Sequence, residues 1–298
     1  MGEYRRDAVD QRTRLSNQLT AVLKLYFPQA LVLVGDEVST PLAGDFLSRW
    51  ITLDSAQQAT PDALRKFYWA HFCRSAQRIR ERIDLLKSAL PITNDQAIIL
   101  SSILRVRCLV SQIRALGKAI GDFELRIRQL MQQHPDAALF EEIPGAGDAL
   151  APRLLVAFGS DRERFSSALE LQTLSGAAPV TKRSGKRCTV HRRWACPKFL
   201  LQTFHEFAGC SVPRSVWAAA FYHQQRAAGK GHHAALRSLA FKWIRVLFRC
   251  WKTRTPYSEA RYLECLRKRN APLLTFLEPA TVGAQPVGSP SPKPVSYD

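Results

Sequence analysis

One serine in this sequence stands inside a run of basic residues that contains no acidic residue. Ser184 lies within residues 180–193, where the surrounding cations are Lys182, Arg183, Lys186, Arg187, Arg192 and Arg193. A hydroxyl in such surroundings could attack a phosphodiester, because nearby positive charge stabilises the negative charge that develops during phosphoryl transfer. The residue types therefore make Ser184 a candidate nucleophile and the six cations a candidate DNA-binding set. A solvated Ser-Gly turn is the more common alternative for this pattern.

Other reactive side chains lie close to this serine in the sequence. His191 could act as a general acid or base, and it could equally contact phosphate or simply pack. Cys188, His191, Cys196 and His205 are considered as zinc ligands, but their intervals match no standard zinc motif, so no metal site is predicted. The seven cysteines are odd in number and irregularly spaced, which favours free thiols in a reducing compartment over a disulfide framework.

Two glycines in residues 143–155 provide a second candidate contact to nucleic acid. Gly145 and Gly147 have no Cβ atom, so the backbone can turn tightly and bring N–H groups to a phosphate at a helix N-terminus. A turn that leads into a helix with Ala151, Leu154 and Leu155 facing inward is the pattern of a helix-hairpin-helix, which binds DNA without reading its sequence. An ordinary glycine turn is the alternative, and the basic surroundings favour DNA binding.

Residues 237–252 interleave aromatic and basic side chains. On a helix this spacing places the rings on one side and a basic ridge on the other. The rings are expected to form core, with base stacking as the less favoured alternative, and the ridge could contact phosphates. The rings are Phe241, Trp243, Phe248 and Trp251, and the ridge consists of Lys242, Arg245, Arg249 and Lys252.

Helices must position these motifs, and helical spacing of apolar residues dominates the first part of the chain. Helices are predicted over residues 4–26, over residues 41–53 and from Pro61, after the capping residue Thr60. Between residues 94 and 133, apolar residues recur every seven positions, which predicts a long coiled-coil-like helix. Its expected partner is a helix over residues 75–89, in an antiparallel hairpin, or a second copy of the chain.

The expected fold class is all-α, because few alternating β-branched runs could form a sheet. We expect three parts: a helical, partly coiled-coil linker over residues 1–135, a domain with the helix-hairpin-helix over residues 136–278, and a disordered tail over residues 279–298. The tail is rich in Pro, Gly and Ser, whereas the whole chain is 46% hydrophobic, enough to support folded cores.

The chain is strongly basic. Its 43 Lys and Arg residues against 25 Asp and Glu residues give a net charge of +18, which favours a polyanionic partner, and nucleic acid above all. No apolar run approaches the roughly 20 residues of a membrane-spanning helix, and the first residues lack a signal-peptide core. We expect a cytoplasmic protein, associated with the nucleoid when bound to DNA, and no membrane partner.

Several of these motifs, in order, resemble the insertion-sequence one-hundred-ten family of transposases, relatives of the Piv-type DNA invertases. The resemblance runs from Arg12 to about Asn270 and rests on residues 12–19, 23–28, 144–147, 174–179, 183–186 and 240–243. It implies recombination of a mobile DNA element. It also implies a C-terminal domain whose serine, matched here by Ser184, joins covalently to DNA, and in some members a structured RNA partner.

The family resemblance further implies a RuvC-like nuclease fold that holds metal ions through four acidic residues. Such a fold needs strands that carry carboxylates, whereas this chain begins in predicted helices. Glu3, Asp7 and Asp10 are interpreted as a charged helix face. We therefore expect no Mg²⁺ site in this chain, which would be a truncated remnant or would be completed by a separate polypeptide.

Three functional hypotheses follow. The first is a transposase that acts through Ser184 and is inactive without the nuclease half. The second is a non-enzymatic DNA-binding remnant or regulator. The third is a helical scaffold that only dimerises, and homo-oligomerisation through the long helices is expected in any case.

Overall fold

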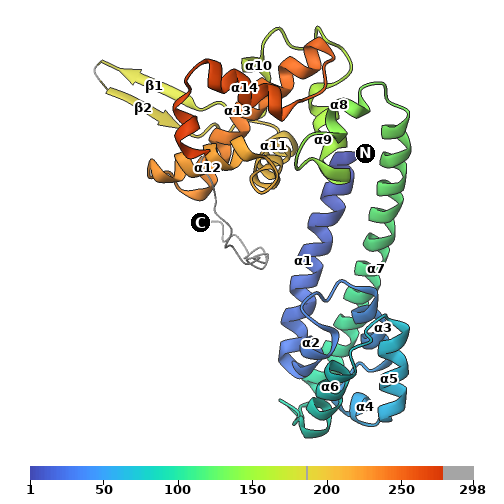
Figure 1. The fold of residues 1–298 in the computed structure, drawn as a ribbon. Helices are drawn as coiled ribbons and strands as arrows, with labels where there is room; N and C mark the ends of the chain where they lie inside the picture. The colour runs from blue at the N-terminus through green and yellow to red at the C-terminus, as the bar shows by residue number, and fades with distance from the viewer. Residues whose placement is uncertain (186, 278–298) are drawn as a thin grey trace. The chain divides into compact units, whose positions relative to one another are not determined.

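The computed structural model describes residues 1–185 and 187–277, and the chain divides after Gln133 into two compact units (Figure 1). Most of the described residues are helical, as predicted. The predicted tail, residues 279–298, lies outside the described residues. Each unit is built around its own buried apolar cluster.

The all-α prediction is wrong at one place, and that place contains Ser184. Strands β1 (Val180–Ser184) and β2 (Arg187–His191) form an antiparallel hairpin. Val and Thr residues favour extended backbone, and Gly185 has the positive φ, +53°, that a two-residue hairpin turn requires. The sequence analysis did not predict these strands, because both faces of the hairpin are largely exposed. Its sequence therefore shows no alternation of apolar and polar residues.

In the first unit, the long helix α7 (Gln96–Gln132) packs antiparallel along α1 (Gly2–Tyr26). Arg5 Nε donates to Glu124 Oε1 over 3.1 Å, and Arg105 Nη2 donates to Gln18 Oε1 over 2.7 Å. The predicted pairing of α7 with α6 (Ala76–Ser88) is therefore wrong. Helix α6 instead packs on α2 (Gln29–Val34), α4 (Leu53–Gln57) and α5 (Pro61–Ala70). The partner of α7 is α1.

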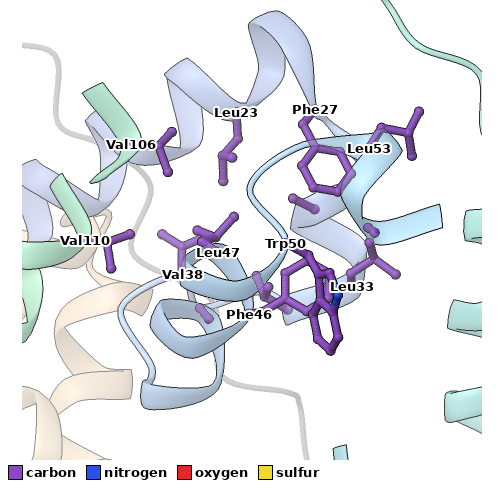
Figure 2. Close-up of a cluster of buried hydrophobic side chains, with 14 of the residues drawn as sticks. Leu23, Phe27, Leu33, Val38, Phe46, Leu47, Trp50, Leu53, Val106 and Val110 are labelled. Atoms are coloured by element: carbon purple, nitrogen blue, oxygen red, sulfur yellow. The ribbon is translucent and has the colours of Figure 1, made fainter. Parts of the chain in front are cut away.

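The short helices of the first unit enclose an aromatic core. Figure 2 shows part of this cluster, including Phe27, Phe46 and Trp50. The Trp50 and Phe67 rings meet edge to face, with centroids 5.1 Å apart. Thr60 accepts a hydrogen bond from the Ala63 N–H over 3.2 Å, so the predicted cap before α5 is confirmed. Helix α3 (Pro41–Arg49) is capped in the same way by Thr40.

By length and composition, helix α7 could cross a membrane. It contains an 18-residue window of mean hydropathy 1.3, with 28% of that window buried. The prediction that the chain contains no segment long and apolar enough to span a membrane is therefore wrong. Scattered polar residues break up the apolar run of α7 but lower its mean hydropathy only a little. Within its unit, α7 buries Val106, Leu109 and Ile113, and its Arg114 bonds to Asp45 of α3. These contacts are those of a scaffold helix in a folded unit.

The second unit surrounds the central helix α13 (His232–Thr253). Besides the β hairpin, the other elements are α8 (Ala137–Glu141), α9 (Gly147–Phe158), α10 (Ala168–Leu174), α11 (Lys198–Ser211), α12 (Val216–Ala227), α14 (Glu259–Lys268) and the 3₁₀ helix η1 (Pro272–Phe276). Trp243 and Trp251 of α13 are fully buried, and Trp243 Nε1 donates to Ser211 Oγ over 2.8 Å. These α13 tryptophans are core, as expected, and cannot stack on bases.

Candidate nucleic-acid interface

The register of the β hairpin decides which basic residues accompany Ser184. Ser184 pairs with Arg187, and Lys182 pairs with Thr189. Directly paired residues share a face, and residues two apart along a strand do as well. Ser184, Lys182 and Arg187 therefore lie on one face, while Arg183 lies on the other.

Ser184 is the last residue of β1, and it is exposed. The turn leaves open space around Gly185, where an added Cβ would meet no atom within 4 Å. Arg187, directly across the ribbon, has its Cβ about 5 Å from that of Ser184 by strand geometry. The Ser184 and Arg187 side chains thus start from neighbouring positions at the accessible end of the hairpin, while Lys186 lies outside the described residues.

His191 shares this face but stands at the other end of the hairpin, paired with Val180. Val180 is four residue steps along β1 from Ser184, so His191 lies about 13 Å from Ser184 along the hairpin. Its Nε2 lies 3.2 Å from Thr189 Oγ1. His191 is therefore out of reach as a base for Ser184, and the phosphate-contact interpretation of this histidine stays a prediction.

The two arginines that follow β2 have separate surroundings. Arg193 Nε donates to the Ala178 carbonyl over 3.3 Å, which fastens the base of the hairpin. The Arg192 guanidinium lies over the Trp194 ring, 4.3 Å from its centroid. Sequence reasoning overlooked Trp194, although an aromatic residue directly after a basic run was the available signal.

The two glycines of the predicted helix-hairpin-helix occupy different environments. An added Cβ at Gly145, where φ is +89°, would lie 2.6 Å from the Cys210 carbonyl oxygen of α11. An added Cβ at Gly147, where φ is +53°, would meet no atom within 4 Å. Gly145 is thus required for packing inside the unit, and Gly147 is the one that leaves the start of α9 open to a ligand.

Helix α9 buries Ala151 and Leu154, as predicted, whereas Leu155 is half-buried. Next to these, Arg153 is also buried, and its Nε donates to Thr203 Oγ1 over 3.0 Å. Arg153 also forms an ion pair with Glu206, with 2.5 Å between Nη1 and Oε2. This arginine is therefore part of the internal packing of α9 on α11.

The predicted basic ridge of α13 is narrower than its sequence indicates. The Lys242 ammonium lies 4.3 Å from the centroid of the Phe221 ring, and burial, followed by repulsion from Arg245, lowers its pKa. Lys252 Nζ donates to the Arg162 carbonyl over 2.6 Å and pairs with Glu163 over 2.9 Å. Arg245 and Arg249 are the exposed members of the ridge.

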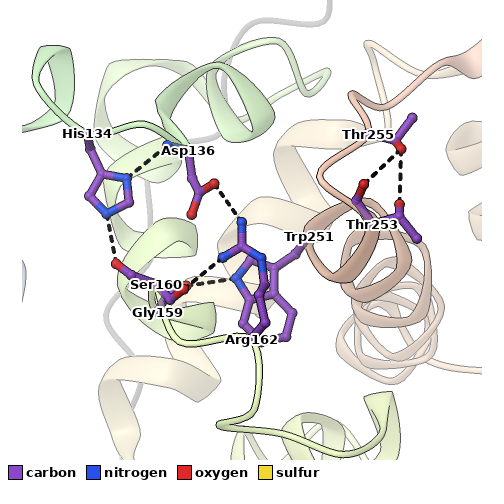
Figure 3. A network of polar contacts seen from close by, with 8 residues as sticks. All are labelled: His134, Asp136, Gly159, Ser160, Arg162, Trp251, Thr253 and Thr255. Carbon is purple, nitrogen blue, oxygen red and sulfur yellow. Dashed lines mark hydrogen bonds and ion pairs between the residues drawn. The ribbon is translucent and has the colours of Figure 1, made fainter.

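A buried ion pair holds the entry to α8 against α13, as Figure 3 shows. Arg162 Nη2 lies 2.6 Å from Asp136 Oδ1, and the two side chains are only 13% and 10% exposed. The Arg162 guanidinium also lies 4.9 Å from the centroid of the Trp251 ring, whose Nε1 donates to the Gly159 carbonyl over 2.7 Å. This network fixes both ends of the α8–α9 segment.

We expect Asp136→Asn to destabilise the second unit by roughly 3 kcal/mol at neutral pH, because it leaves the buried Arg162 charge uncompensated. The hydrogen bond from Arg162 lowers the pKa of Asp136. The carboxylate therefore stabilises the fold above its unfolded-state pKa of about 4, and this contribution is lost as the pH falls below that value. Denaturant unfolding at neutral and acidic pH measures both effects.

Asp161→Asn is the matched control, since the Asp161 side chain is exposed and accepts a local hydrogen bond from the Glu163 N–H. Its effect should be within about 0.5 kcal/mol of zero. Equal losses from the two substitutions would contradict a stabilising role for the buried pair.

The residues present do not fit an acidic metal site. In the part of the chain that the structure describes, no group of three or more His, Cys, Asp or Glu side chains is placed to hold a metal ion. Asp10 pairs with Arg6 over 2.9 Å, and Asp7 accepts from Gln11 over 2.8 Å, both one helical turn apart.

Residues 137–223, which contain the glycine turn and the β hairpin, match the family described as Transposase IS116/IS110/IS902 family. The chain is 27% identical to the IS117 mini-circle protein of Streptomyces coelicolor, over 88% of this chain and 64% of that protein. It is 29% identical to a 42 kDa protein of insertion element IS900 from Mycobacterium paratuberculosis, over 67% of this chain and 52% of the relative. The chain thus spans about half to two thirds of the length of these relatives.

Proposed function

We propose that the chain, whose residues 137–223 match the Transposase IS116/IS110/IS902 family, is a transposase of this family, that its second unit binds DNA, and that Ser184 is its nucleophile. The observation that carries the proposal is the shared face of Ser184, Lys182 and Arg187 at the exposed end of the hairpin. This face can hold a phosphodiester against the hydroxyl.

In the proposed step, Ser184 Oγ forms a bond to the phosphorus of a DNA phosphodiester. The bond from that phosphorus to one bridging deoxyribose oxygen breaks, and the proton lost by the serine balances the proton gained by the leaving oxygen. Arg187 and Lys182 stabilise the negative charge that builds up on the non-bridging oxygens. The product is a phosphoserine link between protein and DNA.

Gly147 supplies a second proposed contact. Its open position at the start of α9 lets backbone N–H groups approach a phosphate without interference from a side chain. Gly145 contributes indirectly, because its close approach to α11 holds the turn in place. A structured RNA partner, homo-oligomerisation and a cytoplasmic location stay predictions from the sequence.

Binding to duplex DNA is expected to weaken steeply as salt rises, because each neutralised phosphate releases counterions. Arg187→Ala should lower affinity by a similar factor for all DNA sequences and reduce the slope of log affinity against log salt by about one. Fluorescence anisotropy with a labelled duplex at several salt concentrations measures this. A weak DNA affinity that does not change with salt concentration would instead support a helical scaffold that only dimerises.

Arg183→Ala is the matched control for Arg187→Ala. Both arginines are exposed on the same hairpin, but Arg183 lies on the face opposite Ser184. The Arg183 substitution should change affinity and slope less. A larger effect at Arg183 would place the phosphate on the other face and remove the support for Ser184.

A further inference from the structure

Trp194 is an exposed aromatic side chain at the base of the hairpin. It is 77% exposed, whereas Trp50, Trp217, Trp243 and Trp251 are almost fully buried. Exposing an indole to water forgoes the free energy that its burial would contribute. Single exposed rings are common on proteins, so the further contacts of Trp194 are what indicate a ligand.

The backbone on both sides of Trp194 is anchored. Arg193 bonds to the Ala178 carbonyl, and the Cys196 N–H donates to the Trp194 carbonyl over 3.0 Å. The Cys196 sulfur is packed so closely on Gly176 that a Cβ there would lie 2.5 Å from it. The ring is thus presented to solvent from a fixed segment.

A cation already covers one side of the indole. The Arg192 guanidinium is 4.3 Å from the ring centroid, a cation–π contact. Arg237 of α13 is close enough to Arg192 for the two charges to interact, because burial, and then repulsion from Arg192, lowers the pKa of Arg237. A ring with one stacked guanidinium and a second arginine nearby offers a stacking surface beside positive charge, which is the combination that single-stranded nucleic acid requires.

We propose that Trp194 is a stacking platform for an unpaired base of single-stranded DNA, with Arg192 and Arg237 facing the adjoining phosphates. The proposal rests on the proposed DNA-binding function and names a base contact for it. A single strand is the expected occupant because the bases of an intact duplex already stack on one another, so their faces are not available to a tryptophan.

The position of the ring relative to Ser184 sets a spacing between the two proposed contacts. Ser184 and Val180 are the two ends of β1, about 13 Å apart, and Trp194 lies three residues after His191, which pairs with Val180. This distance is longer than one nucleotide of an extended single strand, so the two contacts fall on different nucleotides. The stacked base is therefore not the one next to the phosphate that Ser184 is proposed to attack.

The test compares Trp194→Ala with wild type on two probes: a short oligothymidylate and an abasic oligomer with the same number of phosphates. On the oligothymidylate, Trp194→Ala should weaken binding about 5- to 100-fold, the usual range for loss of one base–aromatic stack. On the abasic oligomer the two proteins should bind alike. Trp194→Phe, which keeps a ring, should retain most of the affinity.

Trp69→Ala is the matched control, because Trp69 is also exposed, at 57%, but lies in the first unit. It should leave oligothymidylate binding unchanged. In a Trp69→Phe background, Trp194 is the exposed tryptophan that remains, and oligothymidylate should quench its fluorescence while the abasic oligomer should not.

Two results would overturn the proposal that Trp194 stacks on a base. One is an unaltered affinity of Trp194→Ala for oligothymidylate, and the other is an equal loss of affinity for the abasic oligomer. If wild type still binds duplex DNA in a salt-dependent way, only this inference fails. If wild type binds neither duplex nor single strand in dilute buffer, the proposed DNA-binding function fails first.

Discussion

Replacing Ser184 with alanine is expected to abolish any covalent protein–DNA adduct and to leave duplex affinity nearly intact. The proposed adduct requires Oγ, which this substitution removes, whereas the proposed phosphate contacts come from Arg187, Lys182 and backbone groups. Ser184 is exposed at the hairpin turn, so the fold should not change. The measurement is a denaturing gel of labelled element-end DNA after incubation with protein and Mg²⁺, alongside anisotropy for affinity.

Thr189→Ala is the control for Ser184→Ala. Thr189 carries a hydroxyl on the same face of the hairpin, opposite Lys182, but it lies away from the turn. Any adduct that the wild-type protein forms should also form in this variant. Adduct that persists in Ser184→Ala would exclude Ser184 as the nucleophile, and wild-type protein that binds without adduct would favour a DNA-binding regulator or remnant.

Gly145→Ala is expected to destabilise the second unit by about 3 kcal/mol, because it adds positive-φ strain to a clash with backbone. The new methyl would lie 2.6 Å from the Cys210 carbonyl oxygen, and backbone at the end of α11 cannot move aside as a flexible side chain would. Denaturant unfolding followed by near-ultraviolet circular dichroism, which is sensitive to the buried tryptophans of this unit, measures the loss.

Gly147→Ala is the informative partner substitution. Gly147 also has a positive φ but has open space around it, so alanine should cost only about 1 kcal/mol, the strain of left-handed backbone. If a phosphate approaches this position, the added methyl should also weaken duplex binding. Equal stability losses at Gly145 and Gly147 would contradict the packing role of Gly145, and unchanged DNA affinity at Gly147 would remove it from the interface.

Local features of the fold followed from the sequence alone. The starts of α3 and α5 are confirmed, because a threonine followed by proline satisfies the free N–H groups of a helix start within a few residues. The extent of α7 is confirmed, and so is the burial of Trp243 and Trp251 on α13, whereas Phe241 and Phe248 are only half-buried. Helical spacing decides which side chains share a face. These are short-range effects, so one stretch of sequence contains all the information they need.

Contacts between distant segments needed the tertiary structure. Helix α7 packs along α1, since the neighbouring helix α6 packs on α2, α4 and α5 instead. The register of the hairpin separates Arg183 from Ser184. Lys242 lies over the Phe221 ring, and Lys252 pairs with Glu163. Adjacent basic residues look equivalent in a sequence, whereas strand alternation and long-range packing decide which of them can reach one phosphate.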